Sequence, residues 1–170
     1  MGSGIDPEAI GAHVLAAADA TGVPYEVMAC DPDLADTAEF CERYGVALEE
    51  SGNCIVVASR TEPREFAACL VLSHTRLDVN RTVRKLMGVR KLSFASADDT
   101  SELTGMMIGG VTPFGLPEGL PIYVDQAVME LESVVIGGGS RSQKLRVPPA
   151  ALERLPGMQV IEGLAQAPAG

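Results

Sequence analysis

The segment at residues 105–117, Gly-Met-Met-Ile-Gly-Gly-Val-Thr-Pro-Phe-Gly-Leu-Pro, is the part of the chain best suited to chemistry. Gly109, Gly110 and Gly115 allow backbone angles that other residues resist, and they let the main chain approach a ligand closely. Pro113 removes one donor and stiffens the turn. Such a loop can present N–H and C=O groups in a fixed array to a carbonyl or a ribose hydroxyl. An ordinary tight connection between strands is the equally weighted alternative.

Motifs for phosphate binding, dinucleotide binding and covalent catalysis are absent from the sequence or ambiguous. The loop lacks the Gly-Lys-Ser/Thr of a P-loop, and it does not open a long helix as a dinucleotide-binding GxGxxG does. Residues 137–139, three glycines followed by Ser140 and Arg141, could hold an anion in a nest of amides, or they could form a simple hairpin turn. Neither a GxSxG motif nor a cysteine with an evident histidine partner indicates covalent catalysis.

The cysteines and the composition favour a soluble chain with reduced thiols. Cys30, Cys41, Cys54 and Cys69 include no close pair, so a metal site is weakly supported and we expect no cofactor. No run of eighteen apolar residues and no secretory segment is evident, which predicts a cytoplasmic protein that does not enter a membrane. The sequence gives no indication of oligomeric state.

The net charge of −10 argues against binding to DNA or non-specifically to RNA, because phosphate-binding proteins usually show a basic face. One basic cluster remains, namely Arg81, Arg84, Lys85, Arg90 and Lys91. A solvated helix face leading into a strand is the favoured interpretation. A small contact surface for an RNA end is the alternative.

The elements that must position the loop follow from boundary signals and periodicity. Asp6 and Pro7 begin a predicted helix that ends near Gly22. The apolar runs 53–59 and 66–73 predict an antiparallel hairpin covered on both faces. Further strands are expected at residues 24–28, 91–95, 122–124, 134–136, 144–147 and 159–162, with further helices at 36–44, 78–88, 98–105, 125 onward and 149–155, and a turn at 137–142.

At 170 residues these elements suit a single domain. Hairpins and uneven helix spacing predict an α+β fold with a mixed, largely antiparallel sheet flanked by helices. We expect a flexible N-terminus at residues 1–6, the domain at 7–164 and a flexible tail at 165–170.

Three blocks in order carry a resemblance to a known family: Gly-Gly-Val-Thr-Pro-Phe-Gly at 109–115, Leu-Pro-Ile-Tyr-Val-Asp at 120–125, and Val-Ile-Gly-Gly-Gly at 135–139. With Leu145 and the Pro-Pro-Ala-Ala-Leu segment that follows, they resemble the YbaK/ProX family, which includes free-standing relatives of the prolyl-tRNA synthetase editing domain. The similarity extends from the first helix to Gly163.

The resemblance implies a trans-acting aminoacyl-tRNA deacylase that hydrolyses the ester of a mischarged tRNA without a metal. Its partners would be the 3′ end of aminoacyl-tRNA and, as a candidate, a tRNA synthetase. Gly109 and Pro113 match the family's GxxxP loop, which holds the aminoacyl-ribose end, and Asp125 matches the acid after the following strand. From the residues alone, Asp125 could orient water or a loop, or could simply cap the next helix.

The remaining candidate residues surround this loop. Within it, Gly110 and Thr112 complete the expected catalytic set; Gly115, Gly138 and Ser140 are expected to contact substrate. The family commonly has a lysine on the first hairpin strand, and here that position falls on Val56 or Val57, our last two substrate-binding candidates.

The missing lysine keeps other functions open. A binding module for a small amino-acid-like ligand or protein partner, without catalysis, is one alternative; a hydrolase of another small ester is a second. For the deacylase, Gly110→Val is predicted to abolish activity while the protein stays folded.

Overall fold

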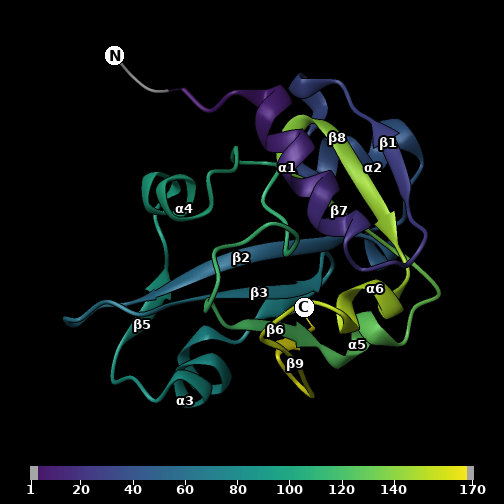
Figure 1. The fold of residues 1–170 in the computed structure, drawn as a ribbon. Coiled ribbons are helices and arrows are strands. Elements are labelled where there is room, and N and C mark those ends of the chain that lie inside the picture. The colour runs from purple at the N-terminus through teal and green to yellow at the C-terminus, as the bar shows by residue number, and fades with distance from the viewer. Residues whose placement is uncertain (1–3, 168–170) are drawn as a thin grey trace.

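The computed structural model describes residues 4–167. Its larger sheet has the strand order β5-β2-β3-β6-β9 (Figure 1). β2 pairs antiparallel with β3 and β5, whereas β3–β6 and β6–β9 are parallel, so the sheet is mixed. The strands are β2 (Gly52–Ser59), β3 (Phe66–Leu72), β5 (Leu92–Phe94), β6 (Ile122–Asp125) and β9 (Met158–Ile161).

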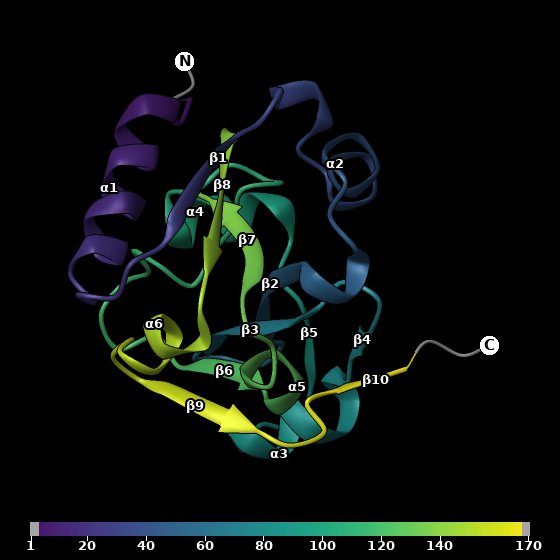
Figure 2. The ribbon, with the colours of Figure 1, turned by 90° about the vertical axis from the view of Figure 1, so that its right-hand side faces the viewer.

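A second, antiparallel sheet has the order β1-β8-β7, with β1 (Glu26–Ala29), β7 (Val134–Gly138) and β8 (Ser140–Val147). A parallel bridge between Ser51 and Val135 joins it to the start of β2. Near the C-terminus, β10 (Ala165–Gln166) pairs antiparallel with β4 (Arg76–Leu77), as Figure 2 shows. Because the pairs other than β3–β6 and β6–β9 are antiparallel, the predicted single α+β domain with a mixed, largely antiparallel sheet is confirmed.

Helices flank both sheets. They are α1 (Pro7–Asp19), α2 (Thr37–Tyr44), α3 (Arg84–Met87), α4 (Ala97–Thr104), α5 (Gln126–Met129) and α6 (Pro149–Glu153), with a π-helical turn at Val79–Val83 before α3 and 3₁₀ turns at Pro32–Leu34 and Leu48–Glu50. Asp6 caps α1 as predicted, accepting from the amides of Glu8 and Ala9. α4 begins at Ala97, capped by the Ser96 side chain, one residue before the predicted start at 98.

Apolar side chains fill the space on both faces of β2 and β3, as their continuous hydrophobic character predicts. Leu70 and Leu72 belong to a cluster shared with α1 and the second sheet. Val57 and Cys69 belong to a cluster with Val83, on the α3 side. Neighbouring residues on a strand point to opposite faces, so the two clusters lie on opposite sides of this sheet. Figure 1 shows α3 and α4 on opposite sides of it as well.

Two boundaries differ from the sequence-based expectation. The predicted turn at residues 137–142 is a tight hairpin in which β7 continues to Gly138 and β8 starts at Ser140, leaving Gly139 at the turn with φ +90°. Residues 165 and 166, expected in the flexible tail, form β10. The parts of the predicted flexible ends at 1–3 and 168–170 lie outside the described residues.

Candidate functional site

The glycine loop leaves α4 at Gly105, whose φ of +72° ends that helix in the left-handed conformation. Gly109 has a φ of +92°, which side-chain-bearing residues rarely adopt. A short turn forms where the Gly110 amide donates to the Met107 carbonyl over 2.8 Å. The loop is therefore a defined backbone structure that requires glycine at 109.

The loop packs backbone to backbone against the β7–β8 hairpin. The Met107 amide donates to the Gly139 carbonyl over 2.9 Å, and the Gly139 amide donates to the Gly110 carbonyl over 2.7 Å. A Cβ on Gly110 would lie 2.5 Å from the Ser140 carbonyl oxygen. Gly110→Val therefore cannot leave this contact intact, so the stability of this variant must be measured alongside its activity.

The same contacts correct the anion-nest hypothesis for residues 137–139. The Gly139 amide is already bonded to Gly110, and the Ser142 amide donates to the Ser140 hydroxyl over 3.2 Å. Gly137 has backbone atoms of Val111 and Gly110 where a Cβ would be. These glycines permit the close approach of two chain segments, and the Gly139 amide that an anion nest would need is bonded within the protein, which favours the hairpin-turn interpretation.

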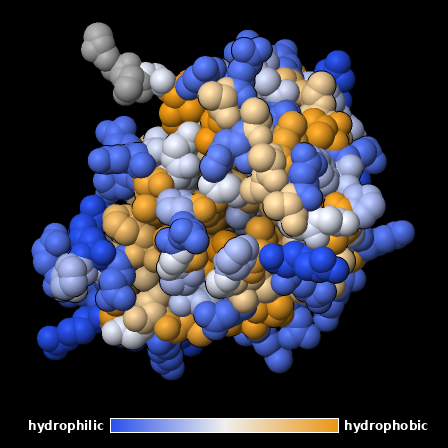
Figure 3. All heavy atoms as spheres, in the orientation of Figure 1, coloured by the Kyte–Doolittle hydropathy of each residue, from blue (hydrophilic) through white to orange (hydrophobic). Residues whose placement is uncertain are grey.

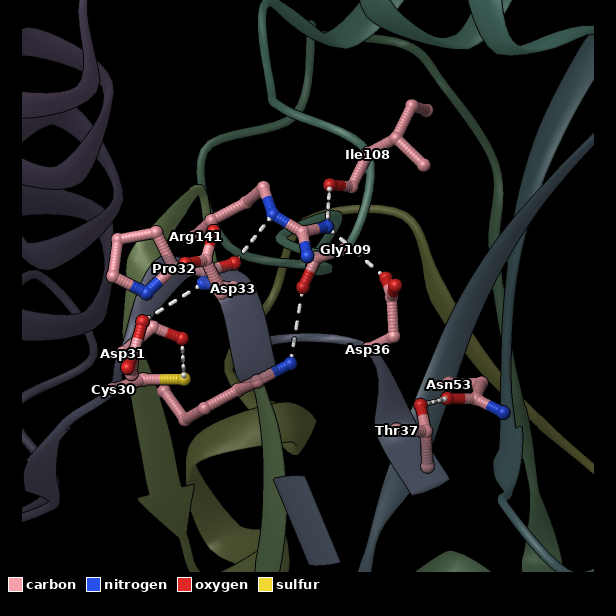
Figure 4. Close-up of polar contacts among 11 residues, drawn as sticks. Cys30, Asp31, Pro32, Asp33, Asp36, Thr37, Asn53, Ile108, Gly109 and Arg141 are labelled. Atoms are coloured by element: carbon pink, nitrogen blue, oxygen red, sulfur yellow. Dashed lines mark hydrogen bonds and ion pairs between the residues drawn. The ribbon is translucent and has the colours of Figure 1, made fainter. Parts of the chain in front are cut away.

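Arg141 ties the loop to two other segments (Figure 4). Its Nη1 donates to the Ile108 carbonyl over 2.9 Å and to Asp36 Oδ1 over 3.0 Å. Its Nε donates to the Pro32 carbonyl over 2.9 Å. The guanidinium therefore links β8, the loop and the segment that leads into α2.

Lys144, three residues further along β8, holds the next carbonyl of the loop. Its Nζ donates to the Gly109 carbonyl over 3.0 Å and lies 5.3 Å from the centroid of the Phe40 ring. The side chain is 7% exposed, and burial lowers the pKa of Lys144 from its ordinary value. Sequence reasoning missed both Arg141 and Lys144 as parts of this site.

A cleft of about 370 Å³ lies beside the loop, between β2, the end of β5, α4 and the start of α2. Its size is within the range of roughly 300–1,000 Å³ typical of small-molecule sites. On one wall, the Thr37 hydroxyl donates to Asn53 Oδ1 over 2.8 Å (Figure 4). Lining residues are Asp36, Thr37, Gly52, Asn53, Cys54, Ile55, Val56, Phe94, Ala95, Ala97, Thr100, Ile108, Gly109 and Val111.

Asp36 is the one charged side chain among the described residues that line the cleft. Figure 3 shows the surrounding face as a mixture of polar and apolar residues, with apolar atoms exposed near its centre. Burial raises the pKa of the Cys54 thiol to about 12, so this lining thiol stays protonated near neutral pH. Within residues 4–167, no group of three His, Cys, Asp or Glu side chains is arranged to hold a metal.

The predicted residues divide between the cleft and its supports. Gly109 and Val56 line the cleft. Val57 faces the opposite side of β2, in the cluster beneath α3. Asn53, on the same strand as Val56, also lines the cleft. Its place on the predicted hairpin was the feature of the sequence from which this role could have been predicted.

The other loop and hairpin candidates lie behind the cleft. Thr112 is fully buried, and its hydroxyl has no hydrogen-bond partner among the described residues. Pro113 is also buried. Gly115 faces α1, where its carbonyl oxygen lies 2.9 Å from His13 Nε2. Gly138 accepts a bond from the Gln143 side chain over 2.9 Å, and Ser140 is buried under the loop.

Asp125 lies apart from these groups, at the end of β6, where it pairs with Ile161 of β9 and precedes α5. Burial raises the pKa of its carboxyl above the ordinary value, and backbone N–H groups near Ala127 and Leu164 oppose that shift. Asp125 occupies the N-cap position of α5, but its side chain makes no capping hydrogen bond.

The fold and the cleft define a class of protein: a small α+β domain with a cleft beside a glycine loop, lined by residues of that loop, β2, α4 and the start of α2. The model of the aminoacyl-tRNA editing domain family matches residues 31–155. The chain therefore belongs to that family, and the resemblance to YbaK-like editing domains is confirmed.

Of two curated proteins with similar sequences, one is named a tRNA deacylase and the other a tRNA ligase. A provisionally named Cys-tRNA(Pro)/Cys-tRNA(Cys) deacylase, EbsC of Enterococcus faecalis, is 22% identical over 108 residues, 64% of this chain and 63% of that one. The matched segment is thus just under two thirds of that relative's length. The proline–tRNA ligase of Limosilactobacillus fermentum is 27% identical over 100 residues, 58% of this chain and 18% of the ligase.

Solved structures share the fold over nearly the whole chain. A protein described as a candidate trans-editing enzyme for prolyl-tRNA synthetase superposes with a TM-score of 0.78 at 25% identity, covering 96% of this chain and 99% of that one. A hypothetical protein, APE2540, gives a TM-score of 0.80 at 25% identity, covering 91% and 99%. Among the described residues, no helix is both long and apolar enough to span a membrane.

Proposed function

We propose that this chain is a trans-acting deacylase that hydrolyses the ester between a mischarged amino acid and the 3′ end of tRNA. Water adds to the ester carbonyl carbon, the bond from that carbon to the ribose oxygen breaks, and a proton passes to the ribose oxygen. The products are a free amino acid and a tRNA with an intact 3′ end. Membership of the editing-domain family supports this reaction class.

The observation that carries the proposal is the position of Gly109 at the cleft. Within residues 4–167, the amides of Gly109 and Val111 donate to no protein acceptor, although both residues line the cleft. Free amides of this kind can bind the oxygen of an ester carbonyl and the negative charge it gains as water adds. The Gly110 amide, bonded to Met107, is not available for this role.

The cleft favours a cationic aminoacyl group over a phosphate. Asp36 contributes an exposed carboxylate at its edge, of which Oδ1 is paired with Arg141, so the other oxygen can bind the α-ammonium group of the amino acid. The described residues that line the cleft include no lysine or arginine to bind a phosphate. In this proposal the substrate's own 2′-hydroxyl assists the attacking water. The lining thiol of Cys54 is protonated near neutral pH and supplies no nucleophile there. Ester hydrolysis is undemanding enough for positioning and main-chain donors to suffice.

The partners in this proposal are the 3′ end of aminoacyl-tRNA and prolyl-tRNA synthetase, in the cytoplasm. Support for the synthetase comes from the ligase of L. fermentum, which contains a matching segment. The structural relative described as a candidate trans-editing enzyme for that synthetase supports it as well.

A panel of tRNAs, each charged with a different amino acid, tests the proposal. The purified chain should release at least one amino acid well above the rate in buffer. Asp36→Asn should raise KM for the responsive substrate about tenfold, because an ion pair with the α-ammonium group becomes a neutral contact. Asp33→Asn removes an exposed carboxylate nearby and should leave KM unchanged. Failure to release any amino acid from the panel would exclude the deacylase.

A further inference from the structure

Two successive peptide units of the loop are each held at the carbonyl by a cation from β8. Arg141 donates to the Ile108 carbonyl over 2.9 Å, and Lys144 donates to the Gly109 carbonyl over 3.0 Å. The peptides joined at Gly109 are therefore both anchored from the same strand, and the residue between them has no side chain to restrict its rotation.

This anchoring determines where the Gly109 amide points. A peptide unit is planar and trans, so its N–H and C=O point in opposite directions. With the Ile108 oxygen bonded to Arg141, the N–H of the same unit, which belongs to Gly109, is directed away from Arg141. We propose that Arg141 and Lys144 are positioning residues that fix the Gly109 N–H as the donor to the substrate carbonyl; this rests on the deacylase function proposed above.

The cations also strengthen the donor. A charged group bonded to a carbonyl oxygen draws electron density from the peptide unit, and hydrogen bonds in such a chain polarise one another. The effect is greatest where solvent is excluded. Lys144 is almost fully buried, and the Arg141 side chain is 24% exposed. The amides that follow the two bonded carbonyls, those of Gly109 and Gly110, thus become better donors.

Stability alone is a poor explanation for Lys144. Removing an ammonium group from water carries a large desolvation cost in proteins, and a single hydrogen bond does not recover that cost. Among the described residues its one hydrogen-bond acceptor is the Gly109 carbonyl, with the ring of Phe40 as its other partner. A methionine of similar length would fill the space without the desolvation cost. A charge at this position is explained if its role is to hold and polarise the loop peptide at Gly109.

Kinetic measurements on the full chain test these roles. With the fastest substrate of the tRNA panel, Lys144→Met and Arg141→Met should each lower kcat about tenfold to a hundredfold, as misplacement of a reacting group does, with KM within about threefold. Lys144→Arg, which keeps a cation, should restore most of the rate. Arg76→Met removes an exposed cation outside the cleft and outside the basic cluster, and it should leave kcat unchanged.

A second readout does not depend on activity. In ¹⁵N–¹H NMR spectra, loss of a bond at a carbonyl shifts the amide nitrogen of the next residue. Arg141→Met should therefore shift Gly109 most, and Lys144→Met should shift Gly110 most, each well beyond any shift in Arg76→Met. If the native chain deacylates no tRNA, the proposed function fails while these shifts still test the anchoring. Unchanged shifts at both glycines, or an unchanged kcat in both variants of an active enzyme, would overturn the inference.

Discussion

Gly110→Ala tests whether the loop depends on its close contact with the β7–β8 hairpin. Gly110 does not adopt a positive φ, so alanine introduces no backbone strain there. Its new Cβ would lie 2.5 Å from the Ser140 carbonyl oxygen and 2.9 Å from two backbone atoms of Gly139. Ordinary contacts of this kind exceed 3.4 Å, and both partners are main chain, so the two segments must separate.

The cost can be worked from these contacts. Overpacking of this kind costs about 1–3 kcal/mol. Separation also weakens the bond from the Gly139 amide to the Gly110 carbonyl, worth about 1 kcal/mol net. The lower entropy of the unfolded alanine chain offsets about 0.5 kcal/mol. The net loss of about 2.5 kcal/mol corresponds to a thermal midpoint lower by about 5–10 °C for a domain of this size.

Thermal unfolding followed by circular dichroism measures this shift, with Gly11→Ala as the matched control. Gly11 is inside α1, has an ordinary φ, and would place its Cβ 3.2 Å from the end of the flexible Gln143 side chain. Helix propensity favours alanine there by about 1 kcal/mol, so the control should be neutral or stabilised. Equal thermal midpoints for the two variants would refute the argument that main-chain contact with the hairpin requires glycine at 110.

Two further predictions concern titration and thiol reactivity. Because burial lowers the pKa of Lys144 in the native state, the unfolded state binds more protons between that lowered pKa and the ordinary 10.5. Native stability should therefore rise with pH across this window relative to Lys144→Met, as urea unfolding at several pH values will show; parallel curves for the two proteins would contradict it. Burial also raises the pKa of the Cys54 thiol to about 12, so iodoacetamide at pH 8 should label this cysteine slowly in the native chain and readily in urea. Mass spectrometry measures the labelling, and rapid labelling of the native chain would contradict the prediction.

Local signals were sufficient for much of the fold. Asp6 and Pro7 mark the start of α1 because capping and proline geometry depend only on neighbouring residues. The hairpin of β2 and β3 followed from two apolar runs separated by a short polar turn. The predicted turn at 137–142 was too long, because consecutive glycines indicate flexibility when only the local sequence is considered. In the structure, Gly137 and Gly138 lie within β7, where neighbouring chain atoms leave no room for side chains.

The site was less accessible to sequence reasoning because its parts meet only through tertiary structure. Arg141 is 33 residues from its carbonyl partner in the loop and 105 residues from Asp36. Alternation along β2 could not say whether Val56 or Val57 faces the loop, since a shift of one residue reverses every side chain. The register with β3, together with the cleft, places Val56 on the side of Gly109.

If the chain acts as the proposed deacylase, the distribution of charge limits which part of an aminoacyl-tRNA the cleft can bind. Asp36 lines the cleft and is paired with Arg141, while Arg141 and Lys144 are also bonded to carbonyls of the loop, and no lysine or arginine is among the described residues that line the cleft. The basic cluster at residues 81–91 is carried largely by the segment around α3, whose Val83 packs with Val57 on the other face of the sheet. With a net charge of −10 besides, the chain has little to attract phosphates near the cleft. We therefore expect selectivity for the amino acid to reside in this domain, and selectivity for the tRNA to depend on a partner such as the synthetase.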